Sequence, residues 1–226
     1  MQKNTYVMTD DVSSPVDTFQ GMGLHNELMS KMKQYSIVDP SEIQKRVMVP
    51  LILGKDVVVH SHPNSGKTLA YILAILHKMC VKDFSSYGGC QTLILSPLQH
   101  ESLAIRSEFN KLSPIPIKCY CPTLSHAPTI LQEICNGVDI VVGTPGRIST
   151  LIEREIIQTD NIKTLLLDDF DVLVSRGFQD AIYDIFRNLS YNTLQVATFS
   201  NSDLISPLEL DLIGRITTSP MFLNVS

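Results

Sequence analysis

The residues best suited to chemistry lie in a short loop between an apolar run and a helical pattern. Val57-Val58-Val59 precedes this loop, and an apolar helical stretch follows it. Backbone N–H groups at such a turn, together with a lysine ammonium, bind phosphate, and a threonine hydroxyl can hold Mg²⁺. The sequence predicts a phosphate-binding loop made of Ser61, His62, Pro63, Asn64, Ser65, Gly66, Lys67 and Thr68. Gly-Lys-Thr alone also occurs by chance on surfaces, so the strand–turn–helix setting carries this prediction.

Two residues make the loop unusual. Pro63 has no backbone N–H, which removes one possible donor to a phosphate. Asn64 stands where a glycine would supply a positive φ, and asparagine is the next best residue there. We expect the loop to form and to bind phosphate less tightly.

A carboxylate ends a second apolar run, Leu165-Leu166-Leu167. Asp168 would therefore sit at a strand end, where a site for Mg²⁺ and a nucleoside triphosphate needs an acid. Asp169 could orient an attacking water, and Asp171 could hold a neighbouring loop. The alternative is a solvated helix start, because acids favour helix N-termini. The upstream Gly-Lys-Thr favours the nucleotide interpretation.

The elements that must position these residues alternate along the chain. Helical patterns cover residues 24–35, the stretch from Pro40-Ser41-Glu42, and residues 68–80. Short apolar runs predict strands at 56–60, 92–95, 117–121, 139–142, 164–167, 195–199 and 221–225. This alternation is typical of an α/β fold with a mostly parallel sheet and helices on both faces. In such folds ligands bind beyond the carboxyl ends of the strands.

Composition limits the class of protein. With 226 residues, 44% hydrophobic and 18% charged, the chain is globular and forms one domain or one and a half. A net charge of −5 argues against nucleic acid held by bulk positive charge, although a local groove stays open. No apolar run reaches about 18 residues, so we expect no membrane partner. The expected compartment is the cytoplasm, with the nucleus as the alternative.

Several motifs in order make the chain resemble the DEAD-box RNA helicases, most closely the initiation factor 4A group, from Phe19 onward. They are Phe19 with Pro40-Ser41-Glu42-Ile43-Gln44 (the Q motif), Ser61 to Thr68, Ser96-Pro97, Val142-Gly143-Thr144-Pro145-Gly146-Arg147, Asp168-Asp169-Phe170-Asp171, Ser175-Arg176-Gly177-Phe178-Gln179-Asp180 and Ser200-Asn201-Ser202. The resemblance implies a RecA-like P-loop NTPase lobe. It also implies a Q-motif region (19–47), a helicase ATP-binding domain (48–226) and no second lobe within these residues. The polar composition at the start of the chain predicts a flexible leader (1–18) before them.

The resemblance assigns roles residue by residue. It implies ATP and Mg²⁺ as cofactors, and single-stranded RNA and initiation-factor scaffold proteins as partners. Gln44, with Phe19, would contact the adenine; Lys67 would bind the phosphates; Thr68 and Asp168 would hold Mg²⁺; Asp169 would hold the hydrolytic water. RNA would lie on Pro97, Thr144, Gly146 and Arg147. Asp171, Ser200 and Ser202 would couple the nucleotide to the RNA.

The chain departs from the family pattern at chemistry positions. Ile37 replaces an aromatic, Asn64 a glycine, Asp169 a glutamate and Phe170 an alanine; an arginine is missing beside Gln99, and Pro122-Thr123 replaces Gly-Gly. A misplacement of about 1 Å costs about 10²-fold in rate, so hydrolysis should be slow and Asp169→Glu should raise it. Three hypotheses remain open: an RNA helicase-type ATPase of reduced activity, a partner-binding relative without turnover, and an unrelated P-loop NTPase or kinase.

Overall fold

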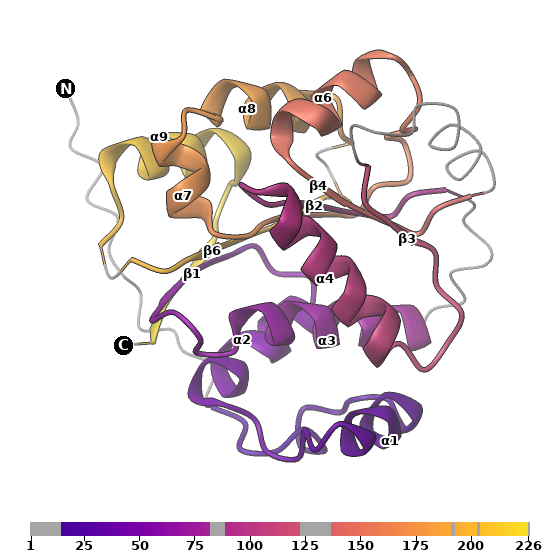
Figure 1. Ribbon diagram of the computed structural model, residues 1–226. Coiled ribbons are helices and arrows are strands. Elements are labelled where there is room, and N and C mark those ends of the chain that lie inside the picture. Colours follow the sequence, from indigo (N-terminus) through magenta and orange to yellow (C-terminus); the bar gives the residue numbers. More distant parts are fainter. Residues whose placement is uncertain (1–14, 82–88, 123–136, 191–192, 203, 226) are drawn as a thin grey trace.

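Seven parallel strands form one sheet in the computed structural model, which describes residues 15–81, 89–122, 137–190, 193–202 and 204–225 (Figure 1). Their order across the sheet is β3-β4-β2-β5-β6-β1-β7. The bounds are β1 Val57–Ser61, β2 Thr92–Leu95, β3 Cys119–Tyr120, β4 Ile140–Gly143, β5 Thr164–Leu167, β6 Gln195–Ser200 and β7 Met221–Val225. Each strand lies where an apolar run predicted one, so the expected α/β class with a parallel sheet is confirmed.

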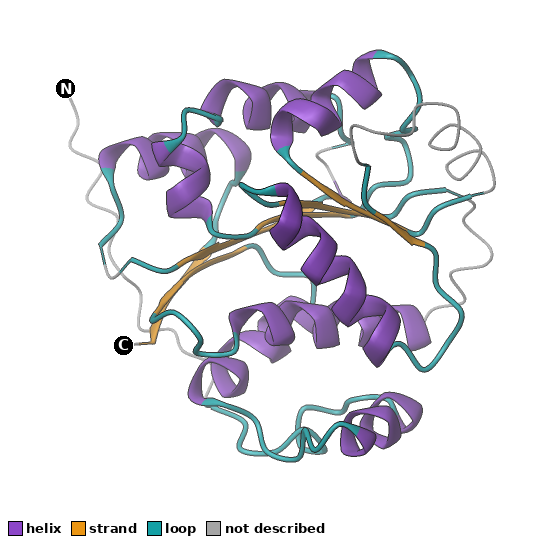
Figure 2. Ribbon diagram, in the orientation of Figure 1, coloured by secondary structure: helices purple, strands orange, loops and turns teal. Residues whose placement is uncertain are grey.

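Helices cover both faces of this sheet (Figure 2). One layer and its apolar core contain α1 Asn26–Gln34, α2 Glu42–Ile52, α3 Lys67–Val81 and α4 Gln99–Leu112. The opposite layer contains α6 Pro145–Glu153, α7 Phe170–Ser175, α8 Gln179–Arg187 and α9 Pro207–Ile216. Helix α3 is buried on most of its circumference because α1, α2 and α4 pack around it, which explains its almost continuous apolar sequence.

Side chains at the helix starts fix where the elements begin. The Gln44 carboxamide oxygen accepts a hydrogen bond from the Ser41 backbone N–H (3.0 Å), which closes the first turn of α2. The same pattern starts α9, where Glu209 accepts from the Ser206 N–H (2.8 Å) and Ser206 Oγ accepts from the Glu209 N–H (3.2 Å). Thr144 precedes Pro145 at the start of α6, where a missing N–H costs nothing.

The strand order decides which loops meet. Strand β6 lies between β1 and β5, with His60 paired to Ser200 and Leu167 paired to Thr198. Because all three strands are parallel, the loops that follow them emerge side by side at one edge of the sheet. The residues after Ser61, Leu167 and Ser200 are therefore neighbours.

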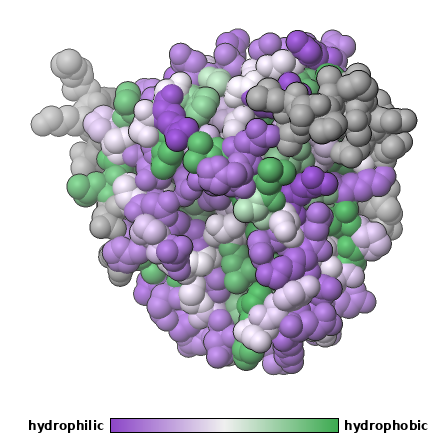
Figure 3. Space-filling model, in the orientation of Figure 1, coloured by the Kyte–Doolittle hydropathy of each residue, from purple (hydrophilic) through white to green (hydrophobic). Residues whose placement is uncertain are grey.

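The described surface adds two observations. On the face drawn in Figure 3, hydrophilic side chains predominate and hydrophobic ones form small groups between them. Within the described ranges, no helix has the length and apolar character needed to cross a membrane. The first fourteen residues of the expected leader lie outside the described residues; next to them, the Val16 N–H donates to the Lys45 carbonyl (3.0 Å).

Candidate nucleotide site and nucleic-acid interface

The loop between β1 and α3 has the backbone of a phosphate-binding turn. Asn64 has a φ of 61°, which confirms the expected left-handed residue, and Gly66 has a φ of 100°. A Cβ at Gly66 would lie 2.6 Å from Gln44 Nε2 and 2.9 Å from Ser41 Oγ. Gly66 is therefore required twice, by its own conformation and by the close approach of the N-terminal end of α2, through Ser41 and Gln44.

Lys67 is folded back onto this loop. Its ammonium donates hydrogen bonds to the carbonyls of Ser61 (2.8 Å) and His62 (2.6 Å) and to Ser65 Oγ (3.3 Å). Burial lowers the pKa of Lys67, and the negative charges of nearby aspartates, Asp169 first, act in the opposite direction. A phosphate would compete with two carbonyls for this ammonium, and the negatively charged oxygen would be the stronger acceptor.

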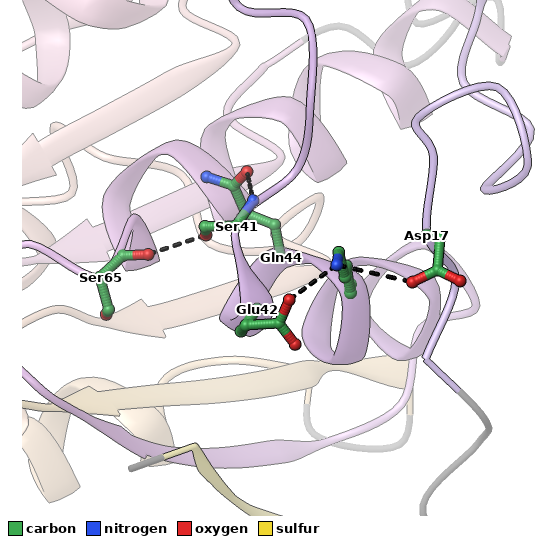
Figure 4. Close-up of polar contacts among 6 residues, drawn as sticks. Asp17, Ser41, Glu42, Gln44 and Ser65 are labelled. Atoms are coloured by element: carbon green, nitrogen blue, oxygen red, sulfur yellow. Dashed lines mark hydrogen bonds and ion pairs between the residues drawn. The ribbon is translucent and has the colours of Figure 1, made fainter.

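The residues before and in α2 hold the loop from one side (Figure 4). Ser41 Oγ donates to the Ser65 carbonyl (2.8 Å), and Gln44 Nε2 donates to the Gly66 carbonyl (3.1 Å). In Figure 4, Glu42 and Asp17 both point toward one lysine; these are ion pairs of 2.6 and 3.5 Å with Lys45 Nζ. Gln44 therefore connects α2 to the phosphate-binding loop, while its predicted contact with adenine stays a prediction.

Asp168 lies at the end of β5 and is almost fully buried. Its Oδ2 accepts a hydrogen bond from the hydroxyl of Tyr71 (2.8 Å), which lies in α3, three residues after Thr68. Burial, and after it the charge of Asp169, raises the pKa of Asp168 to about 7, although the Tyr71 hydrogen bond acts in the opposite direction. Sequence reasoning missed Tyr71, although its place three residues after Thr68 puts it on the same helix face.

Asp169 has an unusual backbone conformation, and its side chain is hydrogen-bonded to Asn201, the residue after β6. It has a φ of 46°, which is costly for a residue with a side chain. Its Oδ1 accepts from Asn201 Nδ2 (2.5 Å), and the Asn201 backbone N–H donates to Asp171 Oδ1 (3.3 Å). Burial raises the pKa of Asp169, and the Asn201 hydrogen bond lowers it. Asn201 thus links two acids of one loop to the end of β6.

A pocket of about 500 Å³ gathers many of the predicted nucleotide-site residues. Phe19 does not line it and is buried in the hydrophobic core, while Ser61, His62 and Ser65 contribute through their contacts with Lys67. The lining also includes Glu108, which sequence reasoning did not single out. The pocket is lined by Ile37, Pro63, Asn64, Gly66, Lys67, Thr68, Leu69, Ile72, Glu108, Asp168, Asp169 and Asn201.

The acids of this pocket fit a divalent cation. Burial raises the pKa of both Asp168 and Asp169, and a neighbouring negative charge raises each further, that of Asp169 for Asp168 and that of Asp171 for Asp169. A bound Mg²⁺ would reverse that penalty, and oxygen donors such as carboxylates and a threonine hydroxyl are the ligands it prefers. Thr68 and Asp168, which both line the pocket, are the residues that would hold it.

A second pocket of about 330 Å³ lies at the carboxyl end of β4. Three of the four residues predicted to bind RNA line it, namely Thr144, Gly146 and Arg147; Pro97 is buried at the end of β2 and does not. Gly143 allows α6 to approach, since a Cβ there would lie 2.9 Å from Ile148 Cδ1. The pocket thus combines a helix N-terminus with an arginine, a pair that suits phosphate.

The loop after β6 is fixed between β1 and α9. Ser200 Oγ donates to Glu209 Oε1 (3.2 Å) in the interior. His60 Nδ1 lies 2.9 Å from the carbonyl of Ser202, which ties the last part of β1 to the same loop. The sequence singled out Ser200 and Ser202 for coupling, and it gave no signal for His60 or Glu209, because both act through contacts between distant segments.

Comparisons with known proteins agree with this geometry. Residues 41–203 match the model of the DEAD/DEAH box helicase family. The chain is 34% identical over 179 residues to an ATP-dependent RNA helicase eIF4A of Aspergillus fumigatus, an alignment covering 78% of this chain and 43% of that protein. It is 32% identical over 233 residues to eukaryotic initiation factor 4A of Zea mays, covering 97% and 53%.

A solved structure shows the same fold. The DEAD box protein of the hyperthermophile Methanococcus jannaschii superposes with a TM-score of 0.83 at 20% identity, covering 94% of this chain and 57% of that one. The chain spans about half the length of the curated relatives it matches. The expected RecA-like lobe is therefore confirmed.

Proposed function

Because the chain belongs to the DEAD/DEAH box helicase family, we propose that it binds ATP with Mg²⁺ and single-stranded RNA, and that RNA stimulates slow ATP hydrolysis. One observation carries the proposal. The loops after β1, β5 and β6 meet in a single pocket that holds Lys67, Thr68, Asp168 and Asp169 together.

Each residue of the pocket would have its own role in binding and hydrolysing ATP. Lys67 would leave the carbonyls of Ser61 and His62 and bind phosphate oxygens, with the N-terminus of α3 facing the same charge. Bound Mg²⁺, held by Thr68 and Asp168, would neutralise charge on the phosphates. Asp169 would accept a hydrogen bond from the attacking water.

Slow turnover follows from the position of this last carboxylate. Asp169 has a side chain one methylene shorter than a glutamate, and its backbone has a strained conformation with a φ of 46°. A carboxylate displaced by about 1 Å from its best position costs about 10²-fold in rate. Reduced activity is therefore part of the proposal.

RNA binding needs no global positive charge. The pocket at the start of α6 offers a helix N-terminus and Arg147 to the RNA backbone. A protein with a net charge of −5 could therefore still bind single-stranded RNA through these local contacts. The same proposal places the protein in the cytoplasm, with the nucleus as the alternative, which imaging of the tagged chain would distinguish.

The test is nucleotide affinity and RNA-stimulated ATP hydrolysis, measured with the chain alone and with a complementary second helicase lobe. We expect ATP to bind with Mg²⁺ and Lys67→Ala to abolish binding, while Lys33→Ala, on the exposed side of α1, leaves it unchanged. Absence of ATP binding at millimolar concentration would show that the proposal is wrong.

A second function has its own motivation: a partner-binding relative of initiation factor 4A that does not turn over ATP. Two contacts favour this function. The Lys67 ammonium is hydrogen-bonded to its own loop and the Asp169 carboxylate to Asn201, and catalysis would need both of these groups. An initiation-factor scaffold protein is the expected partner. Recovery of that scaffold by a chain that hydrolyses no ATP would support this function, and failure to recover it would contradict it.

A further inference from the structure

A separate cavity of about 370 Å³ lies at the opposite edge of the sheet, where the strands begin. The end of α2, the last turns of α3, and the first residues of β2, β5 and β6 form its walls. Its volume falls in the range of small-molecule pockets, about 300–1,000 Å³. None of the residues that line the nucleotide pocket lines this one.

A polar row forms the floor of this cavity. Thr92, Thr164 and Gln195 are the first residues of β2, β5 and β6, and they are paired in register. Two residues further along each strand, on the same face, the side chains belong to the apolar core. The Gln195 amide donates to the carbonyls of Leu51 (3.1 Å) and Lys55 (2.7 Å), so its polarity has a structural reason.

The two threonines lack such a reason. Thr92 is 5% exposed and Thr164 is 7% exposed, and both line the cavity. In the part of the chain that the structure describes, neither hydroxyl has a hydrogen-bond partner. Both hydroxyls open onto the cavity and are not fully enclosed, so an acceptor on a bound ligand would replace the water that reaches them.

The charged side chains among the described residues that line the cavity are two lysines. Lys78 Nζ donates to Gln195 Oε1 (2.5 Å), and Lys163 Nζ donates to Thr193 Oγ1 (3.3 Å). No aspartate or glutamate occurs among the described residues that line it, although the chain as a whole carries a charge of −5. Two ammonium groups along one cavity favour an anion.

The remaining wall is apolar. Ile52 and Leu53 from the end of α2 and Ile75 from α3 line it, and Leu53 is 68% exposed. We propose that this cavity binds a small organic anion, whose carboxylate or phosphate lies on Lys78, Thr92 and Thr164 while an apolar ring or chain packs against this wall. The site is independent of the nucleotide pocket and of the function proposed above.

The test uses benzoate and phenyl phosphate as probes, with benzyl alcohol as a neutral counterpart. Methyl-labelled protein carrying Lys67→Ala, which removes the phosphate-binding lysine of the other edge, is titrated and followed by NMR. We expect both anions to shift the methyl resonances of Ile52, Leu53 and Ile75 in a saturable way. Absence of these shifts at millimolar concentration, or equal affinity for benzyl alcohol, would overturn the proposal.

Three variants assign the contacts. Lys78→Met should weaken anion binding by about tenfold or more, and Thr164→Val, which keeps the shape, by about threefold to tenfold. Thr198→Val is the matched control, because Thr198 is a fully buried threonine of β6 whose hydroxyl has no partner among the described residues and does not line the cavity. Unchanged affinity in Lys78→Met, or an equal loss in the control, would contradict the assignment.

Discussion

The pairing of Asn201 with Asp169 changes what the substitution Asp169→Glu should do. From the sequence alone, restoring the missing methylene is expected to raise turnover. In the structure, Asn201 Nδ2 lies only 2.5 Å from Asp169 Oδ1. An added methylene extends the side chain by about 1.5 Å, the length of one C–C bond, so a glutamate in the same direction would overlap the amide. We therefore expect the single substitution to lower turnover.

The magnitude follows from the contact. A hydrogen bond to a charged group contributes about 1.5–3 kcal/mol, and 1.4 kcal/mol corresponds to a factor of ten. Asn201→Ala alone should thus reduce RNA-stimulated turnover by about tenfold or more, since Asp169 loses its donor. Asp169→Glu alone should cost a similar factor. The double variant removes the overlap along with the amide, and its turnover should reach or exceed that of the parent chain.

The assay is a double-mutant cycle on RNA-stimulated ATP hydrolysis, with kcat and KM determined separately and the affinity for Mg²⁺·ATP measured on every variant. Asp180→Glu, an added methylene on an exposed acid of α8, serves as the control and should change nothing. Additive effects of the two substitutions, or a faster Asp169→Glu enzyme with Asn201 in place, would refute this reasoning.

Three other substitutions test the site and the fold. Gly66→Ala should abolish nucleotide binding with little loss of secondary structure by circular dichroism, because its Cβ would lie 2.6 Å from Gln44 Nε2 at a positive φ. Tyr71→Phe should raise the pH at which the affinity for Mg²⁺·ATP is half-maximal. Asp168 has a pKa of about 7 and must be ionised to bind the metal, and the hydrogen bond lost in this variant favours the ionised form. An unchanged pH profile would contradict the pairing of Tyr71 with Asp168. Burial lowers the pKa of His77 below its ordinary 6.5 while its Nδ1 accepts a backbone N–H at the start of α1. That contribution to stability should be complete above about pH 6.5 and lost as the pH falls, so that His77→Gln flattens the dependence of unfolding free energy on pH between about 5 and 7.

Local sequence determined the elements and the central motif. The apolar runs located all seven described strands, since short continuous hydrophobic segments bury both faces of a parallel sheet. The positive φ of Asn64 could be foreseen because few residue types tolerate that conformation. The start of α2 at Ser41 and Glu42 could also be predicted from the sequence, because the hydrogen bonds that cap a helix form between residues within one turn.

The tertiary structure alone decided which of these residues meet. No local signal places β6 between β1 and β5, and that order is what brings Asn201 to Asp169. Tyr71 and Asp168 are 97 residues apart and pair only because α3 packs beneath the end of β5. The place of Thr164 at a cavity follows only from the register of three strands, which sets Thr92, Thr164 and Gln195 side by side. Periodicity and capping depend on neighbours along the chain, whereas these contacts depend on strand order and helix packing, which a single sequence leaves unspecified.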